Sequence, residues 1–224
     1  MLYLALSCLQ GRLMQEAATE LLSLGISNLQ LTPGLVPTAC FQQWLGDRDI
    51  TYLTHHGFSW NKYNTCVWNE TASCLVTSNS IHPPLLNSLS GKLWQQKAEN
   101  GDYRHLVLET MYPKYHLGNS EDLTWAMDEG FKLAVDVSHI YIQLQSGSLS
   151  TSVWQRLQRY EQIKELHLSS NNGRVDIHKP LTKNSFGLDW VRERGKDNIP
   201  VVLECYMHKL SNQERLEQIE LIDL

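Results

Sequence analysis

Six side chains of the kinds that bind metal ions stand at the ends of short apolar segments in this sequence. Four of them, at positions 55, 82, 109 and 136, follow one another at intervals of 27 residues. Imidazole nitrogens and carboxylate oxygens are common ligands of Zn²⁺ and Mn²⁺, so the set has the chemistry of a divalent metal site. The six residues are His55, His82, Glu109, Asp136, His167 and Glu204.

Three further residues of these kinds lie just past two of the segment ends. His139 follows Asp136 in DVSH, and the segment RVDIHKP contains Asp176 and His178. We expect all three in loops, where residues two apart in an extended chain project to the same side and can share one ion. Each position alone could hold a structural histidine or a capping acid, and Asp136 could simply cap the next turn. Nine such residues in one register favour a metal site.

The elements that must position these residues follow a regular alternation of strand and helix. Amphipathic helical patterns occupy 13–25, 120–131, 150–162 and 212–222, between short apolar runs. Such alternation predicts parallel strands joined by right-handed crossovers, and eight units predict an α/β (β/α)₈ TIM barrel whose strand ends share one mouth. The predicted strands are 2–8, 26–32, 49–55, 75–82, 104–109, 132–136, 163–168 and 200–205.

The barrel is expected to be compact and to form a single domain over residues 1–224. The chain has 224 residues, fewer than the roughly 250 typical of this fold. The segment 57–74 has little helical periodicity, and 188–195 is long enough only for a short helix. We therefore predict that one or two helices are shortened or replaced by loops.

The amino-acid composition argues against a protein that binds nucleic acid through overall charge and against one that spans a membrane. A formal net charge of −5 gives no overall attraction to nucleic acid or to anionic lipid. The five cysteines form no CxxC pair, which favours reduced thiols and a cytoplasmic protein. No segment approaches the roughly 20 apolar residues of a membrane span.

The remaining histidines and a group of aromatic residues are less specific. His105 and His116 fall outside the register and are expected to be ordinary structural histidines, whereas His56 and His208 are expected near the mouth, behind the ligands. Three aromatic side chains in the third loop could stack on a base or sugar, or could plug the barrel mouth. They are Phe58, Trp60 and Tyr63.

The segments THHGFSWN, SIHPP, VLET, DVSH, ELHLS, VDIHKP and VVLEC together resemble the xylose-isomerase-like TIM barrels. The resemblance extends from the third strand onward and is strongest to the endonuclease IV branch, AP endonuclease family 2. It implies three metal ions, with Glu109 shared by the first two. The implied ligand sets are His55, His82 and Glu109; Glu109, Asp136, His167 and Glu204; and His139, Asp176 and His178.

The sequence departs from that branch in the loops. An HPG segment of the branch is HPP here, and an aspartate after the seventh strand is absent from HLSSNN. The chain is also shorter in the loops that would grip DNA. The expected substrate is accordingly a small molecule or a phosphoester, with duplex DNA less favoured.

Three functions fit these residues. The first is a hydrolase that cleaves a phosphoester with clustered divalent ions, Zn²⁺ or Mn²⁺, in which Glu109 bridges two ions and Glu204 positions the attacking water. The second is a sugar or sugar-phosphate isomerase or epimerase with one ion, in which Glu109 and Glu204 transfer protons while His139 and Arg174 bind substrate hydroxyls. The third is an inactive barrel that serves as an interaction module. One to three ions per chain are expected, and the number distinguishes the first two readings.

Overall fold

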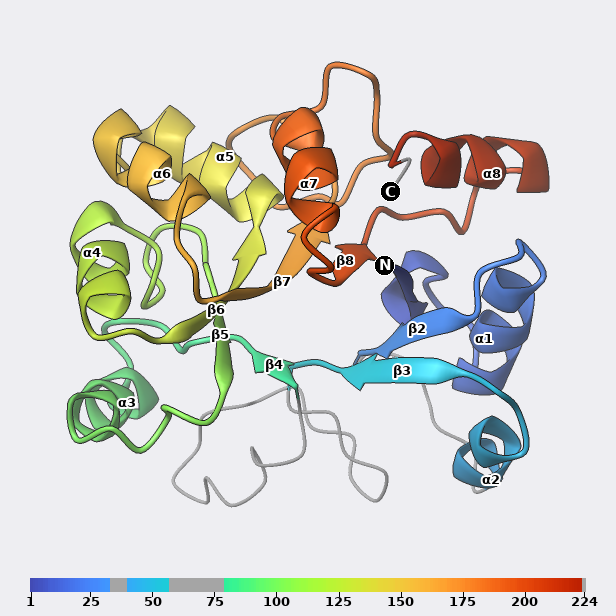
Figure 1. Cartoon of the computed structure of the whole chain (residues 1–224), viewed down its shortest axis with the longest axis horizontal. Helices are drawn as coiled ribbons and strands as arrows, with labels where there is room; N and C mark the ends of the chain where they lie inside the picture. The colour runs from blue at the N-terminus through green and yellow to red at the C-terminus, as the bar shows by residue number, and fades with distance from the viewer. Residues whose placement is uncertain (33–39, 57–78, 223–224) are drawn as a thin grey trace.

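Eight short strands alternate with helices along the chain (Figure 1). The computed structural model describes residues 1–32, 40–56 and 79–222. All eight predicted strands are present, most of them with narrower bounds than the sequence suggested. The strands are β1 Leu2–Ala5, β2 Asn28–Leu31, β3 Thr51–Thr54, β4 Ser80–Ile81, β5 Val107–Glu109, β6 Lys132–Asp136, β7 Ile163–Leu168 and β8 Val201–Leu203.

The strands form one parallel sheet that closes on itself. Hydrogen-bonded neighbours follow the order β3-β2-β1-β8-β7-β6-β5-β4. The two outer strands meet where His55 bridges to Ser80 in parallel orientation. Two backbone hydrogen bonds hold this seam, from Asn79 N to Thr54 O at 2.8 Å and from His56 N to Ser80 O at 2.9 Å. The sheet is therefore a (β/α)₈ barrel, as predicted.

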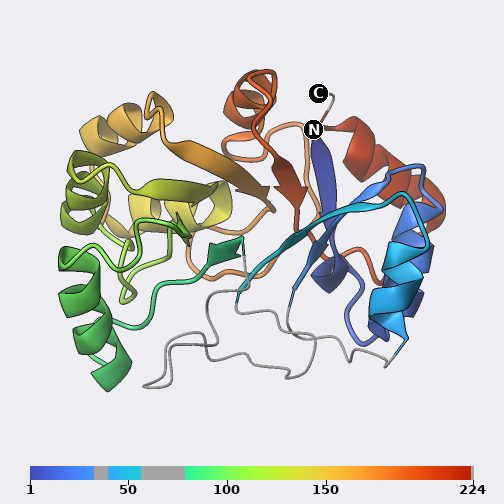
Figure 2. The ribbon, with the colours of Figure 1, turned by 60° about the horizontal axis from the view of Figure 1, so that its bottom comes forward.

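The helices pack around the outside of the strands (Figure 2). Helix α1 shows why: its buried positions Met14, Ala17, Ala18 and Leu21 recur at the three- and four-residue spacing of one apolar face. A 3₁₀ turn, Leu6–Cys8, follows β1. The helices are α1 Met14–Leu22, α2 Phe41–Gly46, α3 Leu89–Glu99, α4 Ser120–Asp128, α5 Val137–Ser146, α6 Thr151–Gln158, α7 Leu188–Gly195 and α8 Asn212–Glu220.

Helix α7 is short, as the sequence predicted, and α2 is also short, although the sequence analysis did not single it out. Helix α7 has 8 residues and α2 has 6. The segment 57–74, with its three aromatic residues, lies outside the described residues. Among the helices that are described, none is both long and apolar enough to span a membrane.

One prediction about local structure was wrong. The chain after β6 was expected to form a loop carrying His139, but α5 begins there directly and His139 lies in its first turn. The cause is Asp136, whose Oδ1 accepts hydrogen bonds from the backbone N–H groups of Ser138 at 2.6 Å and His139 at 3.0 Å. Two of the otherwise unpaired N–H groups of a helix start are thereby satisfied at the strand end.

Candidate metal centre

All nine predicted ligands lie at the carboxyl-terminal ends of the strands. His55 and His82 directly follow β3 and β4, and Glu204 directly follows β8. The other three residues of the strand-end set are the last residues of β5 and β6 and the penultimate residue of β7. His139 is in α5, while Asp176 and His178 lie between β7 and α7. Parallel strand ends of a barrel face one mouth, and the distances below show that these side chains meet there.

Glu109 lies at the centre of the group and is completely buried. Its Oε2 is 3.1 Å from Nε2 of His55 and 3.1 Å from Nε2 of His82, and the two nitrogens are themselves 3.1 Å apart. Ligand atoms held about 2.1 Å from a tetrahedral zinc ion lie about 3.4 Å from one another. The spacing of these three atoms is close to what one ion requires.

A second group surrounds the ring of His167, which is also completely buried. Its Nδ1 lies 3.3 Å from Oε2 of Glu109 and 3.4 Å from Oε1 of Glu204. Ligand-type atoms of Glu109, Asp136 and His139 also lie within 4.8 Å of one another, as do those of His55, His167 and Glu204. These groups differ from the three ligand sets that the family resemblance implies. The reason is that all the side chains form one contiguous cluster, with Glu109 in its middle.

The third group is built on Asp176. Its Oδ2 lies 3.1 Å from Nε2 of His178 and 3.2 Å from Nε2 of His139. The loop is not extended here, contrary to expectation, because His178 has a φ of 42°. This left-handed residue, rather than strand-like alternation, brings the two side chains of the DxH segment together.

Buried polar atoms without hydrogen-bond partners test whether the residues suit a metal ion. Histidine nitrogens lie 3.1–3.3 Å from Oε2 of Glu109. Within the described part of the chain, however, no contact has the geometry of a hydrogen bond to either carboxylate oxygen of Glu109, Oδ2 of Asp136, Nδ1 of His167 or Nδ1 of His178. Each unsatisfied buried polar group costs about 1–3 kcal/mol, and more if charged. Four of these five atoms belong to Glu109, Asp136 and His167 and point into the same cluster. Divalent cations would satisfy them, so the donor set fits a metal.

The carboxylates of the centre differ in their proton affinity. Burial alone would raise the pKa of Glu109, but the charges of His82, His167 and His55 outweigh it and hold that pKa well below its usual range. For Glu204, burial raises the pKa, and the nearby carboxylates of Glu109 and Asp136 act in the same direction. Of the two carboxylates, Glu109 is thus the one that favours the ionised form, and Glu204 is the one that takes up a proton more readily.

The two histidine rings of the third group have raised pKa values. Burial alone would lower the pKa of His139, but Asp136, Asp176 and Glu109 raise it well above its usual value. Burial also opposes the charge on His178, yet its contact with Asp176 raises the pKa of His178 to about 9. The Asp176 carboxyl, in turn, has a lowered pKa, because these two histidines outweigh its burial.

Sequence analysis missed the residues that orient the ligands. Oε1 of Glu165 lies 3.0 Å from Nε2 of His167, and Nε2 of Gln30 donates to the same oxygen at 3.0 Å. Ser80 Oγ is 2.9 Å from Nδ1 of His55, and Nδ1 of His139 is 2.8 Å from the backbone oxygen of Thr110. Such contacts fix the rotation of a ligand ring. Glu165 was detectable, since residues two apart on β7 share a face.

The other histidines lie largely where the register suggested. The ring of His56 is 4.0 Å from that of His82, and the ring of His208 is 5.9 Å from that of Tyr206, which itself packs on His178. His116 is buried, with Nε2 3.1 Å from the backbone oxygen of Gly91, and has a structural role. His105 is exposed.

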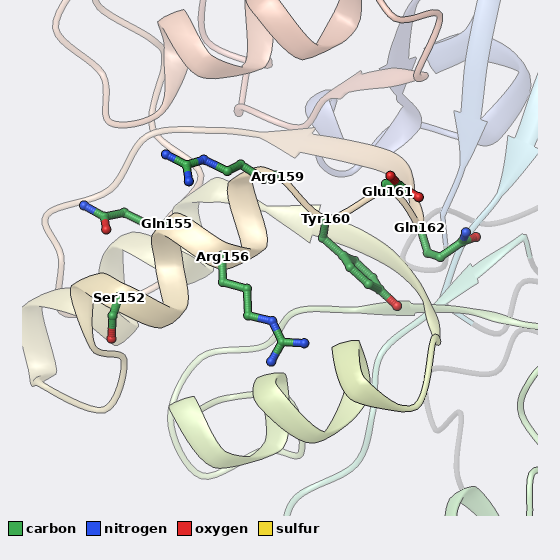
Figure 3. Close-up of a pocket in the computed structure, with 7 residues that line it drawn as sticks. All are labelled: Ser152, Gln155, Arg156, Arg159, Tyr160, Glu161 and Gln162. Atoms are coloured by element: carbon green, nitrogen blue, oxygen red, sulfur yellow. The ribbon is translucent and has the colours of Figure 1, made fainter.

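A pocket of about 520 Å³ at the other end of the barrel is not a candidate for this chemistry. Residues of α6 and of the loop that precedes β7 line it, including Arg156, Arg159 and Tyr160 (Figure 3). Arg156 is paired with Asp128 at 2.6 Å, and Tyr160 donates to the backbone oxygen of Phe131 at 2.8 Å. None of the described residues that line this pocket is a histidine, and the pocket lies at the amino-terminal ends of the strands, away from the ligand cluster.

Comparisons with known proteins agree with the fold. No protein-family model matches the sequence, and no curated protein does. Among solved structures, the chain is similar to a D-tagatose 3-epimerase-like protein, with a TM-score of 0.64 and 13% sequence identity over 99% of this chain and 98% of that one. The barrel, its closure and this likeness together show that the chain adopts a (β/α)₈ TIM-barrel fold like that of this epimerase-like protein.

Proposed function

We propose that this protein is a metal-dependent hydrolase that cleaves a phosphoester at the carboxyl-terminal mouth of the barrel. The observation that carries the proposal is the pair His55 and His82, each 3.1 Å from Oε2 of Glu109. A site with a single ion on Glu109, Asp136, His167 and Glu204 needs neither histidine. Their contact with the same carboxylate supports a site for more than one ion.

The three implied ligand sets supply the donors for such a cluster. His55, His82 and Glu109 would hold one ion. Divalent ions at such a site acidify water and stabilise the charge that develops on phosphoryl oxygens. The remaining two sets are Glu109, Asp136, His167 and Glu204, and His139, Asp176 and His178.

We assign metal binding, proton transfer and ligand positioning to three different glutamates. Glu109 stays ionised because its pKa is held low by the surrounding histidines, which suits a carboxylate shared by two ions. Glu204 has a raised pKa, first because it is buried, and we assign it to orient the attacking water and accept its proton. Glu165 holds the ring of His167 so that Nδ1 stays directed toward both glutamates.

The second candidate is a sugar isomerase or epimerase that uses one ion. It is favoured by the fold likeness to a protein described as D-tagatose 3-epimerase-like. The nearby pair Glu109 and Glu204, both within 3.4 Å of His167 Nδ1, would then move a proton on the substrate, while His139 and Arg174 would bind its hydroxyls.

A metal count combined with two substrate panels separates the candidates. Protein purified without chelator should contain two or three zinc or manganese ions per chain. It should hydrolyse bis(p-nitrophenyl) phosphate or p-nitrophenyl phosphate, lose that activity on chelation and regain it on adding metal back. One ion per chain with interconversion of ketohexoses or their phosphates would instead establish the second candidate. Protein with neither bound metal nor turnover would be the interaction module.

Variants at the first ligand set provide a matched comparison. His82→Ala should remove one ion and most phosphoesterase activity, whereas an epimerase centred on His167 would retain its activity.

We expect abasic duplex DNA to be a poor substrate because the chain carries a net charge of −5 and duplex binding depends on phosphate neutralisation. Efficient, salt-sensitive cleavage of that duplex would contradict this expectation.

A further inference from the structure

A second pocket adjoins the metal centre at the same mouth of the barrel. Its volume is about 630 Å³, and three segments line it: the loop after β5, helix α5 and the loop after β7. The residues that matter here are Tyr112, Lys114, Gln145, Asn172, Gly173 and Arg174. None of them belongs to the ligand sets.

Two of the lining segments continue directly into the third ligand set. The ring of Tyr112 packs edge-on against the ring of His139, with centroids 5.0 Å apart. Arg174 precedes Asp176 by two residues, so their Cα atoms are at most about 7 Å apart. A ligand that fills this pocket would therefore lie beside the group that Asp176 forms with the histidines.

The pocket is basic in a chain that is acidic overall. Among the described residues that line it, Lys114 and Arg174 are the only charged ones, both are exposed, and none is a carboxylate. Neither side chain forms an ion pair with any of the residues that the structure describes. Elsewhere the basic side chains commonly pair with acids, as Arg156 does with Asp128. Two cations without an ion-pair partner in one pocket favour an anionic ligand.

The backbone that carries Arg174 is held in place. Asn172 Oδ1 accepts from the N–H of Arg174 at 3.0 Å and of Val175 at 3.2 Å, and Asn171 Oδ1 accepts from Gly173 N at 2.7 Å. Gly173 has a φ of 73° and rests on α5, where a Cβ atom would come within 2.6 Å of Gln145 Cγ. The loop thus presents Arg174 from a fixed base, which lowers the ordering cost of binding.

Lys114 also stands on a constrained turn. It has a φ of 86°, and its backbone oxygen accepts from Leu86 N at 2.9 Å. The two cations therefore face the pocket from separate, fixed loops. Arginine binds phosphate in a planar, bidentate manner and lysine binds it as a point charge.

We propose that this pocket binds a second phosphate group of the substrate, through Lys114 and Arg174, while the metal centre takes the phosphoester that is cleaved. The inference rests on the proposed function and narrows its substrate class to molecules with two phosphates, such as a sugar bisphosphate or the end of a nucleotide strand. The second phosphate supplies binding and does not react.

Titration calorimetry on zinc-loaded protein tests the subsite without relying on turnover. The probes are thymidine 5′-monophosphate and thymidine 3′,5′-bisphosphate, and the quantity compared is the ratio of their affinities. In the wild-type protein the bisphosphate should bind about tenfold more tightly, the size expected of one or two charge-assisted contacts. That advantage should shrink as salt is raised.

The variant Lys114→Gln/Arg174→Gln should bind both probes with equal affinity and keep the wild-type metal count. Arg159→Gln, an exposed cation in the pocket of Figure 3 at the opposite end of the barrel, should keep the tenfold ratio. A ratio that is the same in the double variant and in the wild type would overturn the subsite. If no phosphoester is hydrolysed but the ratio still depends on Lys114 and Arg174, the proposed reaction fails while the subsite stands.

Discussion

Oε1 of Glu165 lies 3.0 Å from Nε2 of His167, and this contact leaves the opposite ring nitrogen facing Glu109 and Glu204. The carboxylate is buried and also accepts from Gln30. From the barrel interior to its mouth, the spatial order is therefore the Glu165 carboxylate, the ring of His167, and the carboxylates of Glu109 and Glu204. Contacts of this kind hold a metal-binding imidazole in one tautomer and one orientation.

The variant Glu165→Gln should lower the affinity for the metal ion that His167 would bind about 10- to 100-fold. The amide keeps the shape of the side chain but no longer provides a charged acceptor for the Nε2–H group of the ring. Competition with a chromogenic chelator measures the affinity of each ion. Glu16→Gln, at an exposed carboxylate on α1, is the control. Equal affinities in the variant and the wild type would mean that Glu165 does not position His167.

The variants Asp136→Asn and His139→Ala should differ in metal content. Asp136→Asn removes charge from the ion that Glu109, His167 and Glu204 would share, so activity should be abolished. His139→Ala should lower the occupancy of one ion only, because Asp176 and His178 still face each other at 3.1 Å. Elemental analysis of both proteins against wild type gives the counts. If His139→Ala keeps every ion and loses only substrate affinity, the single-ion reading is favoured.

Asparagine is chosen at position 136 because Asp136 has two structural tasks. One oxygen caps α5 through Ser138 and His139, and the other is buried with no hydrogen-bond partner among the residues that the structure describes. Replacing the residue by alanine would remove the cap as well, at a cost of about 0.5–2 kcal/mol. Asparagine keeps an oxygen that can accept those N–H groups, so a change in metal content would not simply reflect a loosened helix.

Replacing His55 should lower the metal count, whereas replacing His56 should leave it nearly unchanged. His55 is buried beside Glu109, while His56 lies behind His82, against its ring. Asparagine is used at both positions because His56 has a φ of 55°, a conformation that asparagine tolerates well. Metal content of the two purified variants is compared directly, and an equal loss in both would contradict the assignment of His55.

The variant Gly173→Ala should lower the affinity for substrate and, to a moderate extent, the stability of the protein. A Cβ atom at Gly173 would meet Gln145 Cγ at 2.6 Å and Tyr141 Cε1 at 3.2 Å, and the residue has a φ of 73°. The loop must move to relieve the contact, and Arg174 and Asp176 move with it. We expect a fall in the unfolding free energy of about 1–2 kcal/mol and a larger KM for a bisphosphate substrate. An unchanged KM would show that the loop position is not important for binding.

The sequence by itself determined the barrel and the register of the candidate ligands. Alternating strand and helix patterns predict a parallel barrel, and in such a barrel every strand end faces one mouth. Ligand-type residues repeated at positions 55, 82, 109 and 136 therefore had to converge, whatever the details of packing. The preference for His55 over His56 follows from the same register, whereas most strands are shorter than the apolar runs predicted.

Only the tertiary structure decided how these side chains are held and what lies beside them. Gln30 and Glu165 are 135 residues apart, and no local pattern links a glutamine on β2 to an acid on β7. The helix that starts at Asp136, the left-handed backbone of His178 and the basic pocket of Lys114 and Arg174 also went unseen. The helix start is local, since Asp136 caps it through Ser138 and His139. The pairing of Gln30 with Glu165 and the basic pocket depend instead on contacts between separate barrel units, which form only once folding has brought distant segments together.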